Sequence, residues 1–144
     1  MQRINLFPAP GFLHGITGNA ENTVANGEMT VKQGADNACS AITVPNVGRD
    51  ELVLSIESRG NGDMQIFDTD WKILNRTCVR DQADWTVENL RFTPTPGKSI
   101  VIGFYPNGGD LIVRRPQLEL ASTYDAAVRG GLPGFFTGDT MPRA

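Results

Sequence analysis

The octapeptide ELVLSIES, residues 51–58, gives the clearest indication of the fold. In it, Leu52, Leu54 and Ile56 alternate with Val53 and with polar residues. Successive side chains of an extended strand point to opposite faces, so the three aliphatic side chains share one face. The octapeptide therefore predicts a β-strand that buries this face.

Further strand-like segments recur along the chain at spacings of roughly 8–15 residues. Gly and Pro interrupt the sequence so often that no long helical period survives between them. The segments lie at residues 27–31, 39–44, 64–67, 71–74, 85–93, 99–105 and 110–115. Together they predict an all-β fold, an antiparallel jelly-roll β-sandwich of about eight strands.

Two stretches rich in Asn, Gly and Asp, residues 61–63 and 106–110, are expected to reverse the chain. Segment 99–105 is apolar on both faces, which is typical of a central strand. Segment 85–93 alternates over its whole length, with Leu90 and Phe92 on one face.

The strand-like segments predict one sandwich domain over residues 23–120, and 144 residues suffice for a single core. Residues 1–22 are expected to form an extended N-terminal arm, because two prolines flank one residue near its middle. Residues 121–144 are rich in Gly and are expected to form an extended C-terminal tail.

Phe135 and Phe136 stand side by side in this tail. Two exposed aromatic rings in succession are unfavourable unless a neighbour covers them. We therefore expect them to contact another subunit, and we count Phe7 and Phe12 of the N-terminal arm with them as candidate assembly residues. A disordered terminus is the alternative.

Arg114 and Arg115 are adjacent, so in a strand they face opposite sides and one of them points at the core or across an interface. They are candidates for pairing with a carboxylate of a neighbouring chain. The alternative is a pair of solvated charges that protects a sheet edge from aggregation.

The net charge of −3 gives no indication of a nucleic-acid partner. No apolar run approaches the ~20 residues of a membrane helix, so no membrane insertion is expected, and no export signal is visible at the N-terminus. Cys39 and Cys78 are expected to be two buried thiols, with a bridge between them as the alternative.

Motifs of enzymes and of phosphate or metal sites are missing from the sequence, and His14 is its only histidine. We therefore expect no catalysis, no cofactor and no metal. Asp63, Asp68 and Asp70 cluster around one predicted turn, where oxygen ligands could hold calcium. Capping of local backbone amides is the favoured reading for these three carboxylates.

Trp71, Tyr105 and Trp85 are the candidates for binding a glycan, because an aromatic face covers the apolar side of a sugar ring. Trp71 follows a turn and is the best candidate for an exposed ring. Tyr105 ends a strand and is expected on the rim of the same surface. Trp85 is read as a core residue, since β-sandwich cores commonly hold a tryptophan.

The sequence NLFPAPGF, residues 5–12, resembles the Asn-Leu-x-x-Asn-Pro-x-Phe opening of jelly-roll modules related to carbohydrate-binding modules. Residues 51–120 resemble the rest of such a module, and GFFTGDT at 134–140 is similar to the Tyr-Phe-Asp-Gly-Asp-Thr segment that follows it. Copies occur in the minor tail proteins of bacteriophages, particularly those that infect actinobacteria. Each motif is short, and their order along the chain carries the resemblance.

The resemblance implies a virion structural protein at the tail tip, made in the host cytoplasm, with other virion proteins as partners. In such a protein the jelly roll either touches a host cell-surface glycan or packs against other tail proteins. A homo-oligomer is also expected for this chain. A capsid decoration protein and a glycan-binding module that contacts the host cell surface are the alternatives. Sugar-binding relatives often hold a calcium ion near their chain ends, but Leu13, His14 and the Arg114–Arg115 pair replace its acids, so no calcium is expected.

Overall fold

The computed structural model describes residues 3–8, 12, 16–34, 38–45, 47–132 and 140–141. Every ladder among the described strands is antiparallel. The predicted all-β jelly-roll β-sandwich is therefore confirmed. The elements, in chain order, are β1 Arg3–Ile4, β2 Ile16–Gly18, β3 Asn22–Ala25, β4 Glu28–Val31, β5 Ser40–Val44, β6 Leu52–Asp68, β7 Ile73–Phe92, β8 Ile100–Leu120, α1 Ala121–Arg129 and β9 Thr140–Met141.

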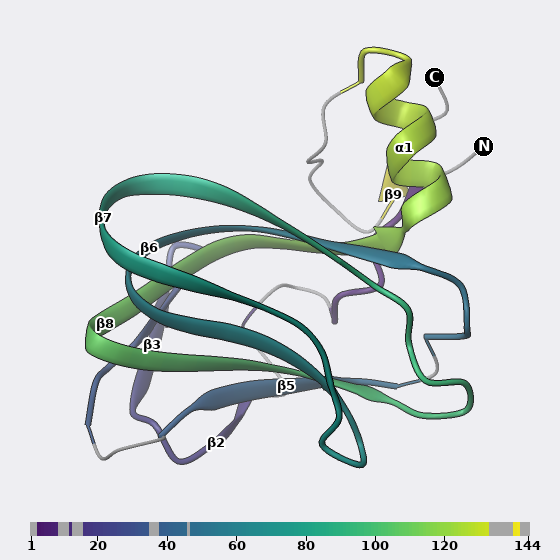
Figure 1. Cartoon of the computed structure of the whole chain (residues 1–144). Helices are drawn as coiled ribbons and strands as arrows, with labels where there is room; N and C mark the ends of the chain where they lie inside the picture. The colour runs from purple at the N-terminus through teal and green to yellow at the C-terminus, as the bar shows by residue number, and fades with distance from the viewer. Residues whose placement is uncertain are drawn as a thin grey trace.

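Three long strands, β6, β7 and β8, run through both layers of the sandwich and bend between them (Figure 1). In the first layer, which we call sheet I, β6 before its bend pairs with the ends of β7 and β8, and β4 and β3 extend the sheet. In the second layer, sheet II, β6 after its bend pairs with the starts of β7 and β8, and β5 and β2 extend the sheet. The core lies between the two layers.

The bend of β6 lies at Gly60 and Gly62, where both ladders shift register. Gly60 has φ +93°, and a Cβ there would lie 2.2 Å from the carbonyl oxygen of Asp110. Gly62 is equally crowded, since its Cβ would lie 2.4 Å from the carbonyl oxygen of Tyr105. Only glycine allows the neighbouring backbone to approach this closely, so these two positions fix the place of the bend.

The expectation that residues 61–63 and 106–110 reverse the chain is therefore wrong. β6 continues through the first stretch and β8 through the second, in the same direction as before. β8 has extra residues at this point, because Gly60 pairs with Leu111 whereas Gly62 pairs with Pro106. The turn-forming composition produces a bulged bend that leads each strand from one sheet into the other.

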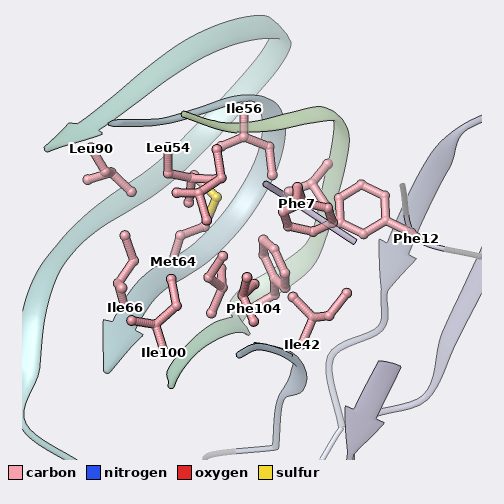
Figure 2. Close-up of a cluster of buried hydrophobic side chains, with 14 of the residues drawn as sticks. Phe7, Phe12, Ile42, Leu54, Ile56, Met64, Ile66, Leu90, Ile100 and Phe104 are labelled. Carbon is pink, nitrogen blue, oxygen red and sulfur yellow. The ribbon is translucent and has the colours of Figure 1, made fainter. Parts of the chain in front are cut away.

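The core is built from the inward faces of both sheets (Figure 2). Leu52, Leu54 and Ile56 are at most 1% exposed, as their alternation predicts. Segment 99–105 also lies centrally, since β8 pairs with both β5 and β6 there.

Phe7 and Phe12 belong to this core, each 3% exposed. The Phe12 ring makes edge-to-face contacts with Phe7, at 5.5 Å between centroids, and with Phe104, at 5.9 Å. Their expected place on an exposed arm is corrected, because both rings pack with the other buried side chains of the core (Figure 2).

The C-terminal segment is also corrected, since residues 121–129 form α1 and not an extended tail. Ala121, Thr123 and Ala127 are the buried residues of this short helix. Beyond it, β9 pairs with β1, so residues near the two chain ends lie side by side beyond the sandwich (Figure 1). Phe135 and Phe136 lie outside the described residues.

A buried ion pair joins Arg3 of β1 to Glu119 of β8. The Arg3 Nε donates a hydrogen bond of 3.0 Å to Glu119 Oε2, and its second guanidinium nitrogen reaches the other oxygen. Gln117 and Thr123 donate to the same carboxylate, at 2.7 and 2.9 Å. β1, β8 and α1 are thereby tied together through Glu119.

Candidate functional site

The outer face of sheet II carries an aromatic platform, by which we mean the side chains of Phe67, Trp71 and Tyr105. Phe67 lies on β6 and is 8% exposed, because the other two rings cover it. Its centroid is 5.7 Å from that of Trp71 and 6.4 Å from that of Tyr105, both in edge-to-face contact. Trp71 itself is 67% exposed, so its ring stands open to a ligand.

Trp71 sits in the turn between β6 and β7 with φ +63°, a conformation that few residues other than glycine adopt. The buried Asp68 holds this turn. Its Oδ1 accepts hydrogen bonds from the backbone N–H groups of Asp70, at 2.8 Å, and Lys72, at 3.1 Å, and its Oδ2 accepts one from Thr95 Oγ1 at 2.7 Å. The Thr95 hydrogen bond, with these two amides, lowers the pKa of Asp68, so the carboxylate is charged at neutral pH.

Tyr105 lies flat because Gly103 has no side chain. A Cβ at position 103 would lie 2.7 Å from Cε1 of the tyrosine ring. Burial, helped by the neighbouring Cys39 thiol, raises the pKa of Tyr105 to about 12, so its phenol keeps its proton at neutral pH. The ring therefore offers both a flat apolar face and a hydroxyl group.

Polar side chains surround the platform. Gln65 lies between Phe67 and Asp63 on the outer face of β6, and the exposed Arg76 is opposite it on β7. Asp63 pairs with Arg80 at 3.2 Å, and Asp70 pairs with Lys98 at 2.9 Å.

The three predicted aspartates do not converge on one point. Asp68 caps the turn, while Asp63 and Asp70 are each committed to a cation. Among the described residues, no group of three or more His, Cys, Asp or Glu side chains could hold a metal ion. Capping by Asp68 is the reading that the turn supports.

The two cysteines are free, with Cys39 half-buried and Cys78 exposed. Cys78 is opposite Asp63 on sheet II, and Tyr105 is opposite Asp63 on its other side. Cys39 comes directly before β5, which pairs with β8. The strands β6 and β8 therefore lie between Cys78 on β7 and Cys39. Both thiols are free as expected, but the expectation that both are buried is wrong, because Cys39 is only half-buried and Cys78 is exposed.

Trp85 lies on the other layer, on the outer face of sheet I. It is half-buried there and not in the core, so its sequence reading was wrong. The guanidinium carbon of Arg114 lies 4.1 Å from the centroid of its ring, and that of Arg59 lies 4.8 Å from it. The structure thus brings Trp71 and Tyr105 together and separates Trp85 from them.

Arg114 and Arg115 both contact Glu57, at 2.8 and 3.4 Å. Arg115 has φ +54° and stands in a bulge of β8, so the two arginines do not simply alternate between faces as expected.

Sequence reasoning missed Phe67 as a member of the aromatic platform. Strict alternation offered the signal, because Met64 and Ile66 are inward and Phe67 must then point outward.

Within the described part of the chain, no helix is both long and apolar enough to cross a membrane.

No protein-family model and no curated protein matches the sequence. Solved structures of carbohydrate-binding modules do resemble the fold. A family 4 module superimposes with a TM-score of 0.57 at 12% identity, covering 76% of this chain and 80% of its own. A variant of the family 29 module CBM29-2 superimposes with a TM-score of 0.57 at 12% identity, covering 85% of this chain and 92% of that module.

A third similar structure is the CBM22-1 xylan-binding domain of Xyn10C from Paenibacillus barcinonensis. Its TM-score is 0.55 at 11% identity, covering 83% of this chain and 92% of that domain. At such identities the similarity establishes a shared jelly-roll fold.

Proposed function

We propose that this chain is a glycan-binding module that uses the aromatic platform of Phe67, Trp71 and Tyr105. One observation carries the proposal: an exposed tryptophan is held at positive φ by a buried, fully hydrogen-bonded aspartate. Backbone strain of this kind costs about 1–3 kcal/mol and persists only where the surroundings enforce it. An exposed ring kept in place at such a cost serves binding better than it serves stability.

The chemistry of the platform suits a sugar. The faces of Trp71 and Tyr105 can cover the apolar side of a pyranose, while Gln65 and Arg76 beside them can meet its hydroxyl groups. The jelly-roll fold shared with carbohydrate-binding modules supports the same conclusion. No catalytic step is part of this proposal.

The binding experiment is affinity electrophoresis of the intact chain in gels that contain xylan, glucomannan, mannan or purified actinobacterial cell-wall polysaccharide. At least one polysaccharide should retard the protein, and Trp71→Ala should abolish the retardation with the thermal transition nearly unchanged. Trp85→Ala, on the opposite layer, is the matched control and should bind as the unmodified chain does. Lack of retardation by every polysaccharide, or unchanged binding by Trp71→Ala, would overturn the proposal.

We also propose that the module is part of a bacteriophage virion, in a minor tail protein at the tail tip that assembles with other virion proteins. The support is the order of the sequence motifs at 5–12, 51–120 and 134–140. Of the residues proposed for assembly from the sequence, Arg114 and Arg115 are on the surface and can contact a partner. Phe7 and Phe12 are buried and cannot.

Counting copies in purified particles by quantitative mass spectrometry tests the virion proposal. A handful of copies per particle supports the tail, and hundreds would instead indicate a capsid decoration protein. Absence from purified particles would refute the virion role without affecting the glycan proposal.

A further inference from the structure

A row of residues crosses sheet II beside the ring of Tyr105. Gly103 of β8 pairs with Gln65 of β6, and Gln65 pairs with Arg76 of β7. The Tyr105 ring occupies the space over Gly103, because a Cβ there would lie 2.7 Å from its Cε1. Neighbouring strands are about 4.8 Å apart, so the tyrosine ring, Gln65 and Arg76 lie side by side on one face.

The row offers charged and amide groups on one side of the ring only. On the other side of Gly103 come Ala41 of β5 and then Thr17 of β2. The Ala41 side chain is apolar, and the Thr17 hydroxyl donates a hydrogen bond to the Ala41 carbonyl oxygen at 3.3 Å. A sugar ring stacked on Tyr105 would therefore find its polar partners toward β7.

Arg76 carries a charge that no described residue pairs with. Its side chain is exposed, and it makes no ion pair and no side-chain hydrogen bond within the described part of the chain. The Gln65 amide, half-buried beside it, likewise has no hydrogen-bond partner among the residues that the structure describes. The N–H donors of both side chains are thus free to meet a ligand on this face.

Asp63, the acid of β6 on the same face, is engaged by other residues. Its Oδ1 accepts a hydrogen bond from Arg80 at 3.2 Å, and its carboxylate accepts another from the Cys78 thiol. It lies one outward position from Gln65 and diagonal to Arg76. Because Arg80 offsets its charge, Asp63 adds little repulsion toward an anion held by Arg76.

The acids of the turn that carries Trp71 are engaged as well. Asp70 pairs with Lys98 at 2.9 Å, and the buried Asp68 accepts hydrogen bonds from two backbone amides of the turn. The exposed Lys72 adds a positive charge next to Trp71. Neither carboxylate of this turn is left over to pair with Arg76.

The charges around the platform therefore have a positive balance. Among the described residues of the outer face of sheet II, the Trp71 turn and the loop before β8 that reaches it, four cations meet three carboxylates. They are Arg76, Arg80, Lys72 and Lys98, and Asp63, Asp68 and Asp70. Asp81 and Asp84 follow on β7, in the bend that leads away to sheet I. A ligand with negative charge is favoured at such a surface.

We propose that the aromatic platform binds an acidic glycan, one whose sugar rings carry a carboxylate as uronic acids do. A sugar ring stacks on Tyr105 and directs its carboxylate toward β7, where Arg76 binds it and Gln65 donates a hydrogen bond beside it. The planar fork of a guanidinium matches a carboxylate with two parallel N–H···O bonds, a geometry that a hydroxyl group does not offer. This inference rests on the proposed function and narrows its ligand class.

The test is isothermal titration calorimetry of the intact chain with two matched pairs of hexasaccharides. β-1,4-Linked glucuronate is compared with cellohexaose, and β-1,4-linked mannuronate with mannohexaose, so that within a pair only a carboxylate replaces a hydroxymethyl group. The acidic member of at least one pair should bind about fivefold more tightly than the neutral member, as one exposed ion pair implies. Added salt should reduce this difference.

Three variants locate the contact. Arg76→Gln should remove the difference in affinity between the acidic and neutral members. Trp71→Ala should abolish the binding of both. Arg129→Gln makes the same charge change on α1, whose Asp125 pairs with Arg91 of sheet I, and should change neither affinity. Thermal melting of each variant verifies that it is folded.

The outcomes separate this inference from the glycan proposal. Equal binding of acidic and neutral members, a preference that survives Arg76→Gln, or tighter binding of glycerol phosphate oligomers of equal charge would each overturn the inference alone. Failure of every hexasaccharide to bind would also overturn it. The proposed function falls with it only if no polysaccharide retards the protein in the gels either.

Discussion

The ring of Tyr105 lies where a side chain at position 103 would have to be, so Gly103 and Tyr105 together make one flat part of the aromatic platform. This relationship is set by two residues of the same strand, on the same face of β8. The shape of the platform therefore depends on the absence of a methyl group.

Gly103→Ala should lift the Tyr105 ring away from the sheet. The added Cβ would lie 2.7 Å from Cε1, and the ring must rotate to avoid it. We expect weaker glycan retention and a cost of about 1 kcal/mol in unfolding free energy, typical of an overpacked site. Tyrosine ring shifts by NMR and affinity electrophoresis measure the two effects. Gly34→Ala is the control, since a Cβ at Gly34 would meet nothing within 4 Å.

Trp71→Gly and Trp71→Ala should both lose glycan binding but should differ in stability. Position 71 has φ +63°, which costs an L-residue about 1 kcal/mol more than glycine. The glycine variant should therefore be the more stable of the two by about this amount in urea denaturation. Equal stability of the two variants would show that the turn carries no strain.

Thr95→Val should lose stability at neutral pH and lose less of it in acid. The hydrogen bond from Thr95 lowers the pKa of Asp68 below its ordinary 3.8. The stability that the charged Asp68 contributes is complete above that ordinary pKa and is lost as the pH falls through the lower folded value. In urea denaturation, the difference in unfolding free energy between the wild type and the variant should thus shrink as the pH falls from neutral to about 2. Thr93→Val, at an exposed threonine, should show no such trend.

Glu119→Ala should destabilise the protein by about 3–5 kcal/mol, because it leaves the Arg3 guanidinium buried without its counter-ion. The double variant Arg3→Met, Glu119→Leu should lose much less unfolding free energy than the two single variants lose together. Glu21→Ala, which breaks an exposed pair with Lys32, should change the unfolding free energy by less than about 1 kcal/mol. Additive costs in urea denaturation would show that the buried pair does not act as a unit.

Strand positions and the main buried face could be predicted from the sequence, since alternation is a local property. The octapeptide at 51–58 shows this, as Leu52, Leu54 and Ile56 are all buried. The continuity of β6 and β8 could not be predicted. Asn, Gly and Asp favour a reversal and a bulged bend alike, and only the pairing of Gly60 and Gly62 with β8 decides between them.

The helix α1 was missed for a similar reason. It spans only nine residues, and its position against the sheet is fixed by distant contacts, such as the ion pair between Asp125 and Arg91. Helices this short have little stability of their own and depend on tertiary packing. The local signals, three alanines and an Arg129–Gly130 ending, are too weak on their own to establish so short a helix.

The candidate site was predicted in part. Trp71 is exposed and Tyr105 lies beside it, as expected from their places at a turn and a strand end. Trp85 was misread because tryptophan is common in β-sandwich cores. The parity of its own strand contradicts that reading, since Leu90 and Phe92 are the buried residues and Trp85 falls on the opposite face.

Because β6, β7 and β8 each belong to both sheets, the two layers cannot separate unless these three strands are themselves pulled out of their sheets. A pull applied from one outer surface to the other is carried along covalent backbone and not only across the packed interior. Mechanical toughness is thus inherent in the way the strands are routed.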